Sequence, residues 1–251
     1  MPPDATTPQG TVDPAEIAKF EAIAAEWWDP SGKFRPLHAM NPCRLDYLLD
    51  QTAAQFGLSR KGRRWLEGVK TVDVGCGGGL LCEPLARLGA DVTGLDAAAG
   101  NIDVAKAHAV QMGLTIDYQA KTSASLVAEG ATFDLVLAME IVEHVADLPT
   151  FLGELSALVR PGGLLVMSTL NRTAQSWAVA IVGAERIMRW LPVGTHDWSK
   201  FPKPDELEAG LTKAGLSVVD AKGMVLDPIR GDWLLSAEDL SVNYILTAEK
   251  A

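Results

Sequence analysis

The sequence predicts a doubly wound α/β fold with a mostly parallel seven-stranded sheet, one antiparallel strand and an N-terminal helical extension. Three observations support this fold class. β-Rich runs alternate with helical stretches from residue 71 to residue 249, a glycine-rich turn follows the first run, and 48% hydrophobic content is ample for a packed core. Strand–helix alternation implies parallel pairing through right-handed crossovers.

The expected strands are short runs rich in β-branched and aromatic residues. They cover residues 71–75, 91–96, 115–119, 133–139, 164–170, 216–221 and 243–249. No convincing helix separates the last two runs. These two runs can therefore form a hairpin that places one antiparallel strand in the sheet.

Helical stretches fill most of the gaps between the strands. They cover residues 79–89, 99–112, 147–159 and 204–214, with Asp147 suited to an N-cap. Two further helical segments, 13–28 and 42–56, precede the sheet. Either they pack over the sheet as an extension, or they also form a lid over a ligand at the carboxyl ends of the strands.

Composition excludes several classes of protein. The net charge of −10 and the pI near 4.9 disfavour general nucleic-acid binding, which needs a basic surface. Cys43, Cys76 and Cys82 are odd in number and lack metal-binding spacing, which favours a reducing compartment. We expect no signal peptide and no run of about 18 apolar residues that could span a membrane. A cytoplasmic location is expected.

The stretch VDVGCGGG (72–79) follows the first strand, and Asp96 ends the second. Glycine lets a ligand approach the main chain, and an acidic residue about 20 positions on suits a ribose diol. A dinucleotide fingerprint would need its third glycine where Leu80 stands, and Asp73 would lie badly beside a pyrophosphate. A ligand with ribose, adenine and a cationic head but no phosphate fits better, and S-adenosylmethionine is such a ligand.

VDVGCGGG followed by GLD (94–96) resembles the signature of class I S-adenosylmethionine-dependent methyltransferases, which have a Rossmann-like fold. The alternative is a structural glycine-rich turn in some other α/β protein. Three other functions stay open: a nicotinamide oxidoreductase, a class I methyltransferase for another small molecule or a protein, and a non-catalytic S-adenosylmethionine-binding module.

The resemblance narrows outside the glycine motif. From Asp13 to Lys250 the chain resembles the ubiquinone-biosynthesis O-methyltransferase family, most specifically at residues 17–48, 139–148, 168–177 and 194–207. This resemblance implies methyl transfer from S-adenosylmethionine, which leaves S-adenosylhomocysteine, to ring hydroxyls of polyprenylated phenols and quinols. The two reactions implied are 3-demethylubiquinol to ubiquinol and 2-polyprenyl-6-hydroxyphenol to 2-methoxy-6-polyprenylphenol.

The resemblance also implies cofactor contacts at Arg44, Gly75, Asp96 and Met139, to which the motif adds Asp73 and Gly77. Arg44 is either a solvated residue at a helix start or a bidentate partner for the cofactor's carboxylate. Met139 either gives adenine an apolar setting or packs in the core.

Catalysis requires help in removing a phenolic proton, because a phenol with a pKa near 10 is mostly protonated at neutral pH. Glu140, Glu143 and His144 stand at the end of the fourth expected strand, and a helical start there would place Glu140 and His144 on one face. We expect His144, with Glu143, to be the catalytic pair, with His144 as general base. Alternatively, all three residues hold a divalent cation such as Mg²⁺, as the family resemblance implies, or they form a polar loop end that faces water.

The expected domain organisation is a disordered tail (1–12), a helical lid (13–60) and a methyltransferase domain (61–251) with an inserted amphipathic segment (171–203). Basic residues outnumber acidic ones in this segment. Its helix can pack on its own domain, cover the substrate pocket, form a dimer face or contact an anionic membrane surface through 171–191. A polyprenyl substrate favours the membrane. The oligomeric state is not predicted.

Overall fold

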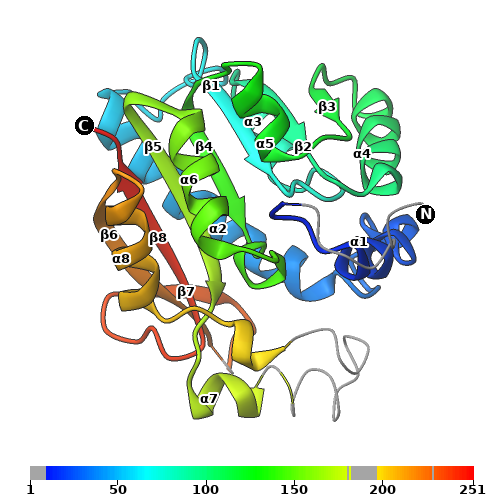
Figure 1. Cartoon of the computed structure of the whole chain (residues 1–251). Helices are drawn as coiled ribbons and strands as arrows, with labels where there is room; N and C mark the ends of the chain where they lie inside the picture. The colour runs from blue at the N-terminus through cyan, green and yellow to red at the C-terminus, as the bar shows by residue number, and fades with distance from the viewer. Residues whose placement is uncertain (1–9, 180, 182–196, 228) are drawn as a thin grey trace, which may run out of the picture.

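The structure is a computed structural model that describes residues 10–179, 181, 197–227 and 229–251. The described residues contain one eight-stranded sheet with the order β3-β2-β1-β4-β5-β8-β6-β7 (Figure 1). Its strands are β1 (Lys70–Val74), β2 (Asp91–Leu95), β3 (Asp117–Gln119), β4 (Phe133–Met139), β5 (Val159–Leu170), β6 (Ser217–Leu226), β7 (Trp233–Ser236) and β8 (Asn243–Glu249).

The predicted doubly wound, mostly parallel sheet is confirmed. Strands β1 to β5 pair in parallel, and β8 enters between β5 and β6 in the antiparallel direction. The predicted count of seven strands is wrong by one, because β7 pairs antiparallel with β6 at the sheet edge. β7 has only four residues, none of them fully buried. A strand this short and half-exposed gives little alternation of apolar and polar residues, so the sequence does not reveal it.

Eleven helical elements surround this sheet in the described part of the chain. They are α1 (Pro14–Glu21), η1 (Ala24–Glu26), α2 (Arg35–Phe56), α3 (Cys82–Arg87), α4 (Ala99–Gln111), α5 (Ser123–Ala128), η2 (Val142–His144), α6 (Leu148–Leu158), α7 (Ala174–Ser176), η4 (Trp198–Lys200) and α8 (Pro204–Lys213).

The N-terminal helices differ most from expectation. The predicted helix 13–28 ends at Glu21 and continues as the short helix η1, whereas the helix predicted to start at residue 42 starts at Arg35. Proline is favoured at helix starts, so Pro42 suggested a boundary, yet α2 contains Pro42 in its interior. Helix α5 was not predicted, although the Thr122 hydroxyl caps it by accepting from the Ser125 N–H.

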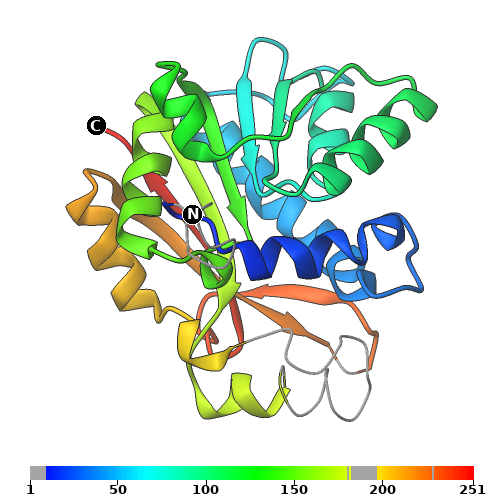
Figure 2. The ribbon, with the colours of Figure 1, turned by 45° about the vertical axis from the view of Figure 1, so that its right-hand side comes forward.

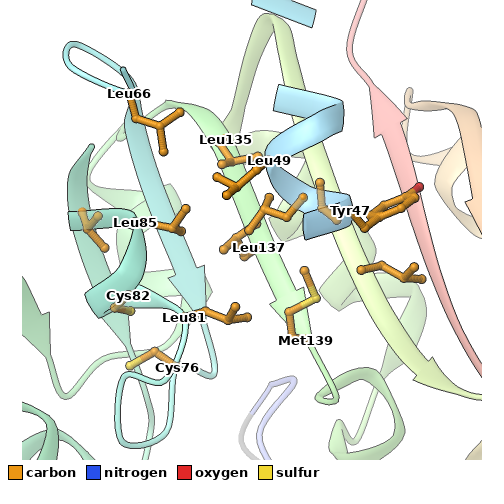
Figure 3. Close-up of a cluster of buried hydrophobic side chains, with 14 of the residues drawn as sticks. Tyr47, Leu49, Leu66, Cys76, Leu81, Cys82, Leu85, Leu135, Leu137 and Met139 are labelled. Carbon is orange, nitrogen blue, oxygen red and sulfur yellow. The ribbon is translucent and has the colours of Figure 1, made fainter. Parts of the chain in front are cut away.

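Two apolar layers cover the sheet, one on each face. Because successive strand residues face opposite sides, Leu135 and Leu137 of β4 join the layer of α2, α3 and α4, shown in Figure 3. Val136 and Ala138 join the layer of α5, α6 and α8. β4 is therefore buried on both faces, which explains its nearly continuous apolar run.

Of the amphipathic stretch expected at 171–191 the structure describes residues 171–179 and 181, and of the disordered tail expected at 1–12 it describes residues 10–12. Contact of that segment with a membrane stays a prediction. Within the described ranges, no helix is both long and apolar enough to cross a bilayer.

Two glycines provide a paired test of the packing. A Cβ at Gly223 of β6 would lie 1.5 Å from the Asp239 carbonyl oxygen, whereas a Cβ at Gly153 of α6 would meet nothing within 4 Å. We expect Gly223→Ala to lower the free energy of unfolding by about 1–3 kcal/mol through overpacking. Gly153→Ala should raise it by roughly 0.5–1 kcal/mol, because alanine loses less backbone entropy in a helix.

Urea denaturation of both variants measures these changes. An unchanged stability for Gly223→Ala would contradict the close approach of residues 237–242 to β6.

Candidate active site

A cavity of about 290 Å³ lies at the carboxyl ends of β1, β2 and β4, the usual ligand position in open α/β sheets. Its floor includes Gly75, Asp96, Met139, Glu140, Glu143 and His144. Residues 11–34, which we name the roof, contribute Thr11, Val12, Asp13, Glu16, Ile17, Phe20, Trp27, Lys33 and Phe34 to its lining. Figure 2 shows α1 of the roof lying across the carboxyl ends of the parallel strands.

The glycine-rich turn is held tightly to the second strand. The N–H groups of Gly75 and Cys76 both donate to the Leu95 carbonyl at 2.8 Å. Gly75 and Gly77 have φ angles of 77° and 54°, which favour glycine. The turn therefore needs glycine for its backbone conformation before any ligand is considered.

Protein side chains occupy the space beside these glycines. A Cβ at Gly75 would lie 2.3 Å from Ile141 Cδ1, and a Cβ at Gly77 would lie 2.2 Å from the Trp27 ring. The main chain at Gly77 is therefore covered by the Trp27 indole of the roof, whereas the sequence predicts that a ligand approaches it there.

Asp96 lines the cavity and is fixed by main-chain donors. Its Oδ1 accepts from the Ala98 N–H at 2.8 Å, and its Oδ2 accepts from the Gly77 N–H at 2.9 Å. Burial raises the pKa of Asp96, although these hydrogen bonds act in the opposite direction. Each carboxylate oxygen retains lone pairs that can accept ligand hydroxyls.

Arg44 and Asp73 are each only 3% exposed and are not part of the cavity lining, nor is Gly77. Arg44 donates to Asn41 Oδ1 at 3.1 Å and to the Leu37 carbonyl at 3.4 Å. Its buried Nε finds no hydrogen-bond partner within the described part of the chain. A buried guanidinium N–H without an acceptor suits an anionic ligand group.

Burial raises the pKa of Asp73 to about 6, although a hydrogen bond from Cys82 and the charge of Arg44 lower it. Cys82 Sγ donates to Asp73 Oδ2 at 3.4 Å. Burial lowers the pKa of Arg44, and the charges of Glu140 and Asp73 oppose this shift. The charges of Arg44 and Asp73 thus stabilise each other while both side chains are buried.

Glu140 has a φ angle of 51°, so it adopts the left-handed conformation that is strained for residues with a side chain. The helical start that would place Glu140 and His144 on one face does not occur at Glu140, because η2 begins only at Val142. The Glu140 carboxylate accepts from Ser168 Oγ at 2.7 Å. Glu143 is buried and accepts from Thr169 Oγ1 at 2.9 Å, and burial raises its pKa.

His144 pairs with the roof, because its Nδ1 lies 2.7 Å from Glu16 Oε2. Burial acts to lower the pKa of His144, but the hydrogen bond to Glu16 and the charges of Glu143, Glu16 and Glu140 outweigh it and raise the pKa. Burial acts to raise the pKa of Glu16, but hydrogen bonds from His144 and Lys19 lower it to about 2. The pair is thus an ion pair at mildly acidic pH.

The three residues of the metal hypothesis have separate partners: Ser168 for Glu140, Thr169 for Glu143 and Glu16 for His144. In the described ranges, no group of three or more His, Cys, Asp or Glu side chains is arranged to hold a metal ion. The metal site gains no support from this geometry and stays a prediction.

Sequence reasoning missed Glu16 and Trp27, two roof residues that line the cavity. Glu16 and His144 are 128 residues apart, so no local pattern pairs them. The Trp27–Trp28 doublet is a local signal, but it fits the end of the helix predicted at 13–28 equally well.

A family model described as a methyltransferase domain matches residues 72–167. The curated ubiquinone biosynthesis O-methyltransferase of Cereibacter sphaeroides (strain ATCC 17023) is 61% identical over 235 residues, covering 94% of this chain and 95% of the relative. The one of Roseobacter denitrificans is 57% identical over 243 residues, covering 97% and 98%.

Among solved structures, magnesium protoporphyrin IX methyltransferase from Synechocystis PCC 6803 with bound S-adenosylmethionine has a similar fold. It gives a TM-score of 0.63 at 16% identity and covers 97% of this chain and 100% of that chain. An S-adenosylmethionine-dependent methyltransferase from Clostridium acetobutylicum gives 0.59 at 12% identity, covering 83% and 91%. Identities this low support the fold alone.

The effect of burying Asp73 can be tested through the pH dependence of the protein's stability. The pKa of Asp73 is raised from 3.8 to about 6, so the folded state holds this proton more tightly than the unfolded chain. The free energy of unfolding should therefore fall by roughly 3 kcal/mol as the pH rises from below 4 to about 6. We expect Asp73→Asn, which cannot ionise, to lack this loss and to be the more stable protein at pH 7.5.

Urea unfolding of the cofactor-free protein at pH 4.5, 6 and 7.5 measures the effect. Asp91→Asn, at an exposed position at the start of β2, is the control. Equal pH dependence of wild type and Asp73→Asn would show that Asp73 is not destabilised by burial.

Proposed function

The chain belongs to the ubiquinone biosynthesis O-methyltransferase family, and from this premise we propose how its cavity performs methyl transfer. It is an S-adenosylmethionine-dependent O-methyltransferase of ubiquinone biosynthesis, and its substrate is a polyprenylated phenol. The reactions proposed are methylation of 3-demethylubiquinol and of 2-polyprenyl-6-hydroxyphenol. The observation that carries this proposal is that Gly75, Asp96 and Met139, at the ends of β1, β2 and β4, line one cavity together with His144 in a chain of this family.

Asp96 would accept hydrogen bonds from the ribose hydroxyls, and Gly75 would border the cofactor from the end of β1. Met139 would provide an apolar contact for adenine. Arg44 would pair with the methionine carboxylate through its buried Nε, which requires the cavity wall to open toward it when the cofactor binds, because Arg44, Asp73 and Gly77 all lie outside the lining. When bound, S-adenosylmethionine supplies a methyl group on a positively charged sulfur.

His144 would take the proton of the phenolic hydroxyl as the oxygen attacks the methyl carbon. The Glu16 carboxylate at 2.7 Å fixes the orientation of the ring and stabilises the imidazolium that forms. Glu143, whose pKa burial raises, lies on the same short helix and stabilises the positive charge on His144. The products would be the methyl ether and S-adenosylhomocysteine, which keeps the electron pair of the broken carbon–sulfur bond, and the proton would remain on the imidazole until water removes it.

The roof would act as a lid over this reaction. Ile17 and Phe20 of α1 line the cavity together with Leu170 and Trp233 of the sheet, so apolar groups would surround the reactants. Excluding water keeps the reactants oriented, which can supply roughly 7–11 kcal/mol of the barrier reduction. The described apolar lining also suits an aromatic ring that carries a prenyl chain.

We expect Asp96→Ala to weaken binding of S-adenosylhomocysteine by about 1.5–3 kcal/mol, because hydrogen bonds to a charged acceptor are lost. This change corresponds to an increase in Kd of roughly 10- to 150-fold. Calorimetry measures it, with Asp103→Ala at an exposed position of α4 as the control. Unchanged affinity in a folded Asp96→Ala protein would show that Asp96 does not bind the ribose hydroxyls of the cofactor.

We expect His144→Ala to lower kcat by about 10²–10⁴-fold with little change in cofactor affinity, because only proton removal is impaired. The assay uses labelled S-adenosylmethionine and a short-chain demethylubiquinol. Full activity of His144→Ala would show that His144 is not the general base.

A separate test addresses the metal hypothesis. If Glu140, Glu143 and His144 hold a metal, EDTA should abolish turnover and Mg²⁺ should restore it, whereas full activity in EDTA would rule the metal out. A wild-type protein that binds the cofactor but never turns over would be a binding module.

A further inference from the structure

Glu83 and His108 form a buried pair that the proposed mechanism does not use. Glu83 lies in α3 with its side chain only 2% exposed, and His108 lies in α4 with 18% exposed. Neither residue lines the cavity. A carboxylate is rarely buried to this extent unless it is paired, so its partners indicate what the residue does.

Both oxygens of Glu83 are engaged. Oε1 lies 2.5 Å from His108 Nδ1, and Oε2 accepts from the Arg87 guanidinium at 2.9 Å. The carboxylate therefore fixes the plane of the His108 ring. That ring stacks on the indole of Trp28 with centroids 3.5 Å apart and an interplanar angle of 8°.

Trp28 connects this pair to the glycine-rich turn. Its Nε1 donates to the Gly78 carbonyl at 3.0 Å, so the indole is fixed on one face by His108 and at one edge by the turn. The series Glu83–His108–Trp28–Gly78 thus joins α3, α4, the roof and the turn after β1 through side-chain contacts.

The neighbouring indole of Trp27 forms part of the cavity wall. Trp27 lines the cavity, stacks on Phe34 with centroids 3.7 Å apart, and donates from Nε1 to Asn101 Oδ1 at 2.9 Å. Its ring fills the space beside Gly77 and Gly78. Because Trp27 and Trp28 are adjacent in the chain, fixing Trp28 also limits where Trp27 can lie.

We propose that Glu83 and His108 are positioning residues that hold Trp28, and through it Trp27, closed over the cofactor end of the cavity. This inference rests on the proposed cofactor site. The competing explanation is that Glu83 and His108 only tie α3 to α4. In that case their loss would lower stability without a selective effect on cofactor binding.

The test compares His108→Ala, Trp28→Ala and the double variant in S-adenosylmethionine kinetics and S-adenosylhomocysteine calorimetry. Each single variant should raise KM and Kd by roughly 5- to 30-fold, the range for losing an aromatic stack and one hydrogen bond. kcat at saturating cofactor should stay within about twofold of wild type, because the base is untouched. Since the residues act through one contact, the double variant should bind no more weakly than the weaker single variant.

His108→Phe keeps a flat ring for stacking and should recover most of the affinity that His108→Ala loses. Glu83→Gln keeps the shape of the side chain and should raise Kd less than His108→Ala. Lys106→Ala, exposed on the same helix, is the matched control and should bind as wild type does. Hydrogen exchange of residues 14–34 with bound S-adenosylhomocysteine should be faster in His108→Ala than in the control.

Equal cofactor affinity in wild type, His108→Ala and Trp28→Ala would overturn this inference alone. Fully additive losses in the double variant would overturn it as well. If wild-type protein fails to bind S-adenosylhomocysteine, the proposed function fails and this inference with it.

Discussion

Parallel pairing of β1 with β2 on one side and β4 on the other is the constraint on which the site depends. Asp73 is in register with Gly94 of β2 and with Leu137 of β4, so the three strands end together. Gly75, Asp96 and Glu140 follow these ends and meet at one edge of the sheet. The two main-chain hydrogen bonds to the Leu95 carbonyl then fix the turn after β1 against β2. A slip of either strand by one residue would turn every side chain to the other face and separate these groups.

This edge of the sheet collects groups that a stable apolar core would exclude. Arg44, Asp73 and Glu143 are buried, and Glu140 adopts a left-handed backbone conformation. Buried charges with few partners lower the free energy of unfolding, as does a strained residue. Their concentration beside one cavity fits a site that binds a ligand with both a carboxylate and a positive charge, because such a ligand provides the missing partners. Stability is thus lower here than in the apolar layers on either face of the sheet.

Sequence patterns predicted what depends on neighbouring residues. The glycine turn and Asp96 at the end of β2 are read from local spacing, and Met139 comes from the family resemblance. Gly75, Asp96 and Met139 line the cavity, whereas Arg44, Asp73 and Gly77 do not. Sequence patterns did not predict the elements whose structure depends on tertiary contacts. β7 is a strand because β6 offers it an edge, and α2 passes through Pro42 because seven of its residues are buried against the rest of the chain. Neither Glu16–His144 nor Glu83–His108 leaves a trace in spacing, since both pairs form between elements distant in the chain.

The roof links the two ends of the reaction within one short stretch of chain. In the proposed site, Glu16 reaches His144 at the substrate end, and Trp27 packs on the glycine turn at the cofactor end, only eleven residues further on. Helix α1 stops at Glu21 and η1 begins at Ala24, so the connection between these contacts is not a rigid rod. Thr11 adds a third attachment, because its carbonyl accepts from the Ala146 N–H at 3.0 Å and its hydroxyl donates to Glu154 at 3.2 Å. Removal of the roof would therefore deprive His144 of its carboxylate partner and expose the cavity to water together. In the proposed mechanism, the base is therefore oriented by the same segment that encloses the reactants.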